Sequence, residues 1–89
     1  MMTKDLREMT WNEAKKACEN LGDEWRLPTK DELQLMYDNK EMIGGFVNNY
    51  YWCSEECDND YGWLKHFGDG NQRNLNKVKS FSVRAVRAF

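Results

Sequence analysis

Residues 22–33 read Gly-Asp-Glu-Trp-Arg-Leu-Pro-Thr-Lys-Asp-Glu-Leu, and this stretch decides the fold. Pro28 favours an extended conformation at Leu27, because the proline ring clashes with a helical residue before it. Thr29 and Glu32 have the spacing of a capping box, in which each side chain bonds to the other residue's backbone amide. The stretch therefore predicts an extended segment that turns into a helix at Thr29. We expect it to serve the fold rather than a chemical reaction.

The totals of the sequence predict one small domain over residues 1–89. Four Trp, four Tyr and four Phe supply enough apolar surface for a core without a metal or cofactor. The net charge is −2, and its 13 basic and 15 acidic residues are interspersed, which predicts no nucleic-acid partner. Three Cys exclude a complete set of disulfides, which favours a reducing compartment.

Hydropathy also predicts where the chain works. The N-terminus lacks the apolar run of a secretory signal, and no segment approaches the ~20 apolar residues of a membrane span. We therefore expect no membrane insertion. The chain is expected to be made in the cytoplasm, and either to stay there or to leave within an assembled particle such as a virion.

Periodicity predicts two helices near the N-terminus. Apolar residues at helical spacing mark residues 11–21, and a second helix is expected at 30–39 with Leu33 and Met36 buried. Residues 3–9 give only a weak indication of an edge strand.

Strands follow the helices. Alternation or strand propensity marks residues 46–53, 61–67, 72–75 and 80–89, with an acidic loop at 54–60. Two helices followed by three or four antiparallel strands predict an α+β domain.

Five motifs appear in a fixed order over residues 10–87. They are Thr10-Trp11-Asn12-Glu13-Ala14 with Cys18, Trp25-Arg26-Leu27-Pro28-Thr29 with Glu32-Leu33, Tyr51-Trp52-Cys53-Ser54, Phe67 with Asp69-Gly70, and Val83-Arg84-Ala85-Val86-Arg87. This series resembles the DUF1566 family, also called the Legionella collagen-like protein C-terminal domain family. The resemblance implies a compact C-type-lectin-like domain, in which two N-terminal helices pack on a twisted, mostly antiparallel sheet of three to five strands. It also implies a bacterial surface, secreted or phage protein. Relatives of that fold display variable loops in phage receptor-binding proteins, or carry formylglycine-generating activity.

Two departures from the family pattern have structural consequences. Cys18 matches a cysteine that commonly pairs with one in the last strand, but Ala85 stands at that second position. The disulfide across the fold is therefore absent. The strand that usually precedes the first helix is nearly missing, so we expect a partner to complete this edge of the sheet.

A set of residues shared with the family motifs is expected to be structural. Arg26, Arg84 and Arg87 are expected to form buried pairs with carboxylates such as Glu32. The full set is Trp11, Cys18, Trp25, Arg26, Leu27, Pro28, Thr29, Glu32, Leu33, Trp52, Trp63, Val83 and Arg84.

Metal and catalytic sites are not expected. Cys53 and Cys57 could form a local disulfide, or a metal site with Asp58 and His66, but a CxxxC with one His matches zinc sites poorly, so free thiols are favoured. His66 has no nucleophile pattern around it, and no cysteine follows Cys57 for a formylglycine-type reaction.

Calcium is the remaining ion to consider. Weak candidates to ligate it are Asp58, Asp60 and Asp69, but the spacing of an EF-hand is absent, and a solvated acidic loop is favoured.

The polar and aromatic residues between positions 46 and 76 form the candidate binding surface. Tyr and Asn together make adaptable contact surfaces. The candidates are Tyr50, Asn59, Tyr61, Asn71, Arg73 and Asn74. We expect a non-enzymatic binding or structural module that contacts protein or glycan, as a homo-oligomer or beside an assembly neighbour. The alternative is a small cytoplasmic enzyme or enzyme inhibitor that uses the same loops.

Overall fold

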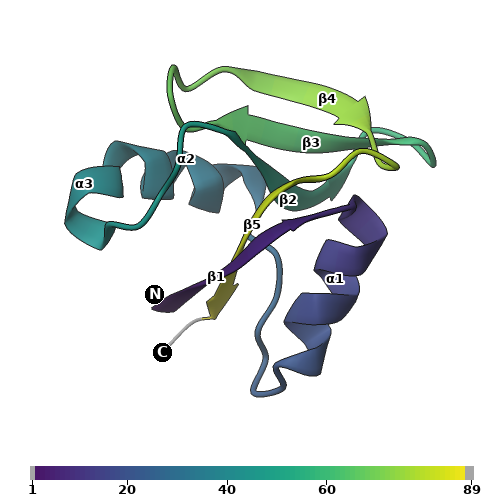
Figure 1. Ribbon diagram of the computed structural model, residues 1–89, viewed down its shortest axis with the longest axis horizontal. Coiled ribbons are helices and arrows are strands. Elements are labelled where there is room, and N and C mark those ends of the chain that lie inside the picture. Colours follow the sequence, from purple (N-terminus) through teal and green to yellow (C-terminus); the bar gives the residue numbers. More distant parts are fainter. Residues whose placement is uncertain (1, 88–89) are drawn as a thin grey trace.

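A computed structural model describes residues 2–87 of the chain. Five strands and three helices follow one another in an order that starts with a strand (Figure 1). They are β1 (Met2–Met9), α1 (Trp11–Asn20), α2 (Lys30–Asp38), α3 (Lys40–Ile43), β2 (Tyr50–Glu56), β3 (Tyr61–His66), β4 (Gln72–Asn76) and β5 (Phe81–Arg87).

The five strands form one mixed sheet in the order β1-β5-β2-β3-β4. Strands β2, β3 and β4 make an antiparallel meander, and β1 pairs antiparallel with β5. The two parts are joined where β5 runs parallel to β2 at Tyr51 and Ser82. In Figure 1 the β1–β5 pair crosses diagonally below the meander.

The expected α+β arrangement, with two N-terminal helices packed on a mostly antiparallel sheet, is wrong. The chain begins with β1, the sheet contains a parallel pair, and strands hold more residues than helices. The short helix α3 was not expected. Strand β1 was only weakly indicated, because most of its side chains are exposed at the sheet edge and carry charge. Because β1 itself occupies this edge of the sheet, no partner is needed to complete the edge.

The two longer helices pack on opposite faces of the sheet. On one face, Trp11, Ala14 and Cys18 of α1 lie in a buried cluster that is completed by Leu27, Trp52, Leu64, Val83 and Ala85. On the other face, Leu33 and Met36 of α2 lie in a second cluster with Tyr51, Cys53, Phe67 and Val86. Alternate residues of β2 and β5 therefore supply both cores, as the two-residue period of a strand requires.

Both predicted capping boxes are confirmed. The Thr29 hydroxyl accepts the Glu32 amide at 3.2 Å, and the Glu32 carboxylate accepts the Thr29 amide at 2.9 Å. Thr10 and Glu13 make the same reciprocal contacts at the start of α1. Each helix begins where its cap satisfies amides that have no partner inside the helix.

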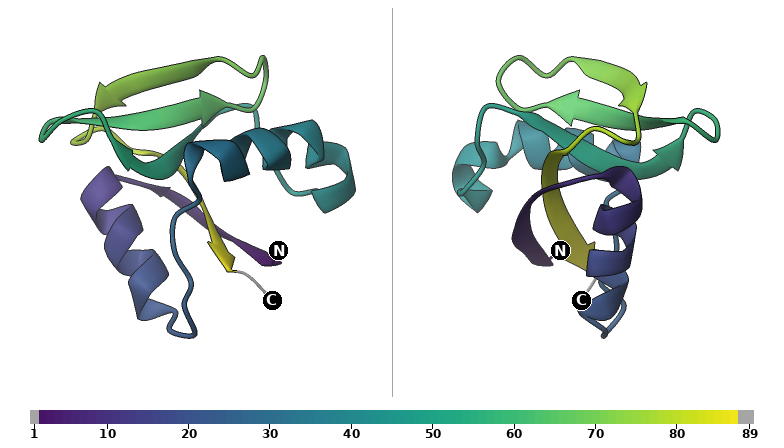
Figure 2. Two further views of the ribbon diagram at one scale, coloured as in Figure 1. Left: turned by 180° about the vertical axis from the view of Figure 1, so that it is seen from behind. Right: turned by 45° about the vertical axis from the view of Figure 1, so that its right-hand side comes forward.

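The stretch that precedes α2 forms backbone hydrogen bonds with two strands, β5 and β2. The Arg26 amide donates to the Val86 carbonyl at 3.0 Å, and the Arg26 carbonyl accepts the Val86 amide at 2.8 Å. The Ser54 amide donates to the Pro28 carbonyl at 2.8 Å. Residues 26–28 thus lie between β5 and β2 where these strands diverge. Figure 2 shows this segment running between α1 and α2.

Three arginines in the family motifs have different partners. Arg26 forms a two-pronged pair with the expected partner Glu32, with Nη2 to Oε2 at 2.8 Å, but the pair is not buried as predicted, because the Arg26 side chain is exposed. Arg87 only approaches Asp23, at 3.9 Å.

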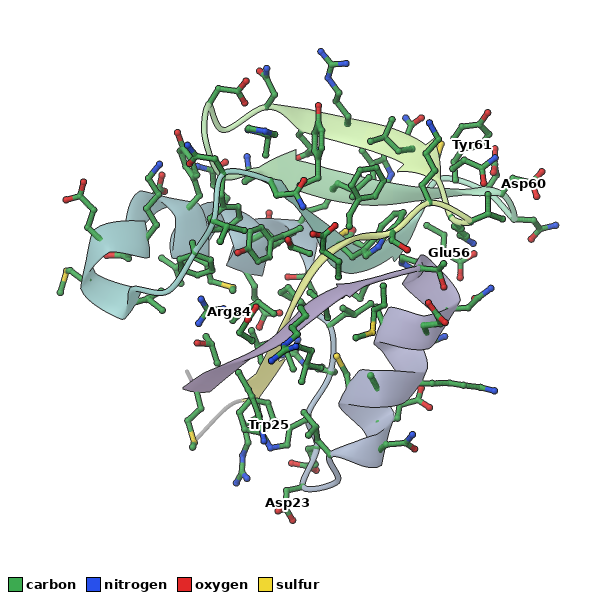
Figure 3. The ribbon with its side chains drawn as sticks, in the orientation of Figure 1. Asp23, Trp25, Glu56, Asp60, Tyr61 and Arg84 are labelled. Carbon is green, nitrogen blue, oxygen red and sulfur yellow. The ribbon has the colours of Figure 1, made fainter. Side chains whose placement is uncertain are left out.

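Arg84 has no carboxylate within the part of the chain that the structure describes, so the expectation of a pair is wrong for this residue. Its guanidinium lies 4.1 Å over the Phe46 ring and donates to Thr3 Oγ1 and the Gly44 carbonyl at 3.2 and 3.0 Å. Figure 3 shows Arg84 between α3 and the β1–β5 pair.

All three cysteines are free, so the local disulfide between Cys53 and Cys57 is not formed. Cys18 and Cys53 are buried, and Cys57 is exposed. Across residues 2–87, the helices are too short or too polar for any of them to span a lipid bilayer.

Candidate functional site

Three aromatic side chains form a row across the α1 face of the sheet, beyond the part that α1 covers. Tyr50 on β2 contacts Phe81 on β5 with ring centroids 5.6 Å apart, and His66 on β3 with centroids 4.8 Å apart. All three are half-buried, whereas Trp52 and Leu64, which are next to them on the same face, are fully buried. We call Tyr50, His66 and Phe81 the aromatic ridge.

The turn between β3 and β4 holds the His66 ring in place. His66 Nδ1 accepts the Gly68 amide at 3.0 Å and lies 3.4 Å from Asp69 Oδ1. In the neutral ring, this bond leaves Nε2 as the protonated nitrogen and a hydrogen-bond donor. The His66 side chain is 26% exposed, so the ridge combines apolar ring surface with a polar atom at one end.

Strand β4 and Asn71, the residue before it, add polar groups beside the ridge. The Asn71 carbonyl accepts the His66 amide at 2.8 Å, and Arg73 pairs in register with Leu64. Because paired residues of antiparallel strands point to the same face, Arg73 lies on the same face as the ridge. Asn71 and Arg73 are exposed. Three of the six predicted binding residues, Tyr50, Asn71 and Arg73, therefore come together.

The other three predicted residues do not join them. Asn59 and Tyr61 lie at the opposite end of β3, and Figure 3 shows Tyr61 beside Asp60 and Glu56 at that end. Asn74 pairs with Trp63 and so lies on the α2 face. The single surface expected from the sequence is split into three places by the turn positions and by the alternation of β4.

Two members of the ridge were not among the residues predicted to bind a partner. His66 was considered only as a metal ligand or catalytic residue, and Phe81 only as part of the strand expected at 80–89. The two-residue spacing of Tyr50 and Trp52, and that of Phe81 and Val83, does indicate that each pair shares one face of its strand. The local sequence does not show that β5 and β2 are neighbours in the sheet.

The acidic loop between β2 and β3 is held by a lysine. Lys77 is only 7% exposed, and its Nζ donates to Glu56 Oε2 at 2.9 Å and to the Asn59 carbonyl at 3.2 Å. The same Nζ lies 4.3 Å over the Trp11 ring. The positive charge of Lys77, whose side chain is buried, therefore offsets part of the negative charge of the loop.

The calcium candidates are not brought together. Asp58 Oδ1 accepts the amides of Asp60 and Tyr61 at 2.8 and 2.9 Å, which makes Asp58 a turn former. Asp69 lies in the other turn, at the far end of β3. Within residues 2–87, no three acidic, His or Cys side chains are placed to hold a metal ion.

Ionisable groups with altered pKa values lie away from the ridge. Burial raises the pKa of Cys18 and that of Cys53 to about 11, so both thiols remain protonated near neutral pH and are poor nucleophiles. The Arg26 guanidinium, with help from the Thr29 amide, lowers the pKa of Glu32 to about 2. These shifts accompany core packing and a helix cap.

The fold and these contacts define a small mixed-sheet domain with one helix on each face and an aromatic, polar surface at one end. The family model of the Lcl C-terminal domain matches residues 2–87. The chain therefore belongs to the Lcl C-terminal domain family, which confirms the resemblance seen in its motifs. A search of curated proteins gave no match to this chain.

Proposed function

We propose that this domain is a non-enzymatic binding module that contacts a protein or a glycan through the aromatic ridge and the adjoining side chains of Asn71 and Arg73. The observation that carries the proposal is the row of three half-buried rings beside exposed polar groups. Aromatic rings offer large contact areas at a low entropic cost, and Asn and Arg add hydrogen bonds that give direction.

The arrangement of nucleophiles supports binding over catalysis. The buried thiols of Cys18 and Cys53 have raised pKa values, and His66 Nδ1 is occupied by the Gly68 amide. A general base needs a free lone pair within reach of the proton that it removes. In His66 that lone pair is used by the fold.

We further propose that the module works within a larger assembly of bacterial or phage origin, such as a virion or a surface structure. Membership of the Lcl C-terminal domain family supports this setting, because the resemblance to that family implies a bacterial surface, secreted or phage protein. A module of this kind needs only a binding face and a stable core.

Substitutions at the two ends of the β3 strand test the binding proposal, because only one end carries the proposed binding surface. We would screen the wild-type chain on a glycan array and against displayed protein fragments, and measure each hit by titration. Arg73→Ala and Asn71→Ala should weaken binding at least tenfold, since each removes a polar group beside the ridge. Asn59→Ala is the matched control and should bind like the wild type, because Asn59 lies at the far end of β3.

The result that would defeat the proposal is also clear. If Asn59→Ala abolished binding while Arg73→Ala left it unchanged, the acidic loop would be the contact surface. Turnover of any hit during titration would show an enzyme instead of a binding module.

A further inference from the structure

The two edges of the sheet differ in how they are protected from other strands. An exposed edge strand presents unpaired amides and carbonyls, and proteins usually guard such edges with charge, bulges or proline. Strand β1 is guarded in this way, since it carries Lys4, Asp5, Arg7 and Glu8 and its register is broken next to Arg7, which has φ of 70°.

Strand β4 lacks these guards. Its sequence is Gln72-Arg73-Asn74-Leu75-Asn76, with one charge, no proline and an unbroken register along β3. In Figures 1 and 2 β4 is the outermost strand, and no other element lies beyond it. Its outer backbone groups are therefore accessible to a partner strand.

The hydrogen-bond pattern shows which residues of β4 face outward. The His66 amide bonds to the Asn71 carbonyl, and the Lys77 amide bonds to the Asp60 carbonyl, at the two ends of the β3–β4 pair. Bonded and non-bonded pairs alternate along an antiparallel ladder. Between these ends, the backbone groups of Arg73 and Leu75 therefore bond to β3. Gln72 and Asn74 direct their backbone amides and carbonyls away from β3, and Asn76 directs its amide the same way.

We propose that β4 pairs antiparallel with β4 of a second copy of this chain, centred on Asn74, to form a dimer with one continuous sheet. This register places Asn74 opposite its own copy and Gln72 opposite Asn76 of the second copy. It is the symmetric register in which every outward-facing residue of β4 meets an outward-facing residue.

The side chains of β4 complement themselves in this register. Gln72, Asn74 and Asn76 lie on the α2 face, since they pair with Lys65, Trp63 and Tyr61. Amides both donate and accept hydrogen bonds, so each cross-strand amide pair can satisfy itself. On the other face, Arg73 lies opposite Leu75 of the second copy, which keeps the two Arg73 charges from facing each other directly.

The dimer would also place two aromatic ridges on one side. A two-fold axis that relates antiparallel strands of one sheet runs perpendicular to it, so each face stays on its own side. Both copies of Arg73 and of the ridge would then point the same way. This consequence rests on the proposed function, whereas the β4 pairing does not.

A charge swap at the two-fold axis tests the pairing. Molar mass is measured by light scattering over a concentration series for the wild type, Asn74→Asp and Asn74→Lys. The molar mass of the wild type should rise toward twice the monomer mass as the concentration increases. Each variant alone should associate at least tenfold more weakly, because like charges then meet at the two-fold axis. An equal mixture of the two variants should restore association, since opposite charges then meet.

Asn20→Asp and Asn20→Lys are the matched controls, because Asn20 is exposed at the C-terminal end of α1, which points away from β4 in Figure 1. Both should associate like the wild type. Circular dichroism checks that each variant is folded.

Hydrogen exchange on the wild type gives a second readout that needs no variant. The amides of Gln72 and Asn74 should become protected as concentration rises, while the Arg73 amide, already bonded to β3, should not change. A wild type that stays monomeric at about 1 mM would overturn the proposal, because such an association is too weak to matter. A mixture of the charge variants that fails to associate would overturn the register, and association unaffected by both variants would place the interface elsewhere.

Discussion

Replacing Glu32 by Gln should destabilise the domain more than the same change at Glu13, although both residues close a capping box. Glu32 accepts the Thr29 amide at 2.9 Å and also binds the Arg26 guanidinium through both of its oxygens. Glu13 makes only the contacts to Thr10. The pair of substitutions therefore isolates what the arginine adds.

The size of the effect follows from the pKa of Glu32, which falls from 4.5 to about 2, mainly through the bonds from Arg26. At about 1.4 kcal/mol per pKa unit, this shift sets a ceiling of about 3 kcal/mol. Solvent screens part of it, because the Arg26 side chain is 47% exposed and that of Glu32 is 25% exposed. We expect a loss of about 1–2 kcal/mol in the free energy of unfolding.

The pH dependence has a defined sign. Because the folded pKa of Glu32 lies below the unfolded value, its stabilisation is complete well above pH 4.5 and is lost as the pH falls toward about 2. The difference between wild type and Glu32→Gln should therefore be largest near pH 7 and shrink toward zero at pH 2. Urea unfolding followed by tryptophan fluorescence at pH 7, 4.5, 3 and 2 measures it.

Two results would refute this reasoning. One is an equal loss of stability in Glu32→Gln and Glu13→Gln at pH 7, which would mean that the caps matter and the arginine does not. The other is a pH-independent difference between Glu32→Gln and the wild type. A double-mutant cycle of Glu32→Gln and Arg26→Ala, which compares the double variant with both single variants, gives the coupling energy between the two side chains. This coupling energy should account for most of the stability lost in Glu32→Gln.

Three further changes test the core, one turn and the thiols. Ala85→Cys should form a disulfide with Cys18, since both positions are fully buried in the same cluster; closing a loop of roughly 70 residues should stabilise the domain by up to about 4 kcal/mol, and finding all cysteines of the variant as free thiols would contradict it. Gly70→Ala should cost about 1–3 kcal/mol, because φ is +79° and a Cβ would lie 3.0 Å from the Tyr37 ring; an unaltered melting temperature would contradict this. Cys57 should react with a thiol reagent at once, and the two buried cysteines only on unfolding; three equally fast thiols would show that the core is open.

Local sequence signals predicted the elements that depend on local contacts. The capping boxes at Thr10 and Thr29 need only residues three apart, and both are present. The antiparallel meander from β2 to β4 follows from alternation and from the turn at Asp69-Gly70. For these parts, the interactions that form the structure are next to one another in the chain.

Pairings between distant segments could not be predicted in this way. Nothing in Met2–Met9 shows that it pairs with Phe81–Arg87, and its exposed charges hide the strand pattern. The parallel contact between Tyr51 and Ser82 determines that the sheet is mixed, and it depends on the whole fold. The same limit explains the binding surface, because Phe81 joins Tyr50 only through that contact.

The position of β5 inside the sheet, between β1 and β2, has a consequence for how the domain folds. β5 is the last strand of the domain to leave the ribosome, yet it pairs with β1, with β2 and with the backbone of Arg26. These are contacts of long sequence separation, which slow folding because a long loop must close first. During synthesis, the N-terminal strand and the meander remain unjoined until residues 81–87 emerge, and the apolar side chains of Leu6, Met9 and Trp52 lack their final neighbours. Nascent chains that stop before β5 should therefore be the form most exposed to chaperones and proteases.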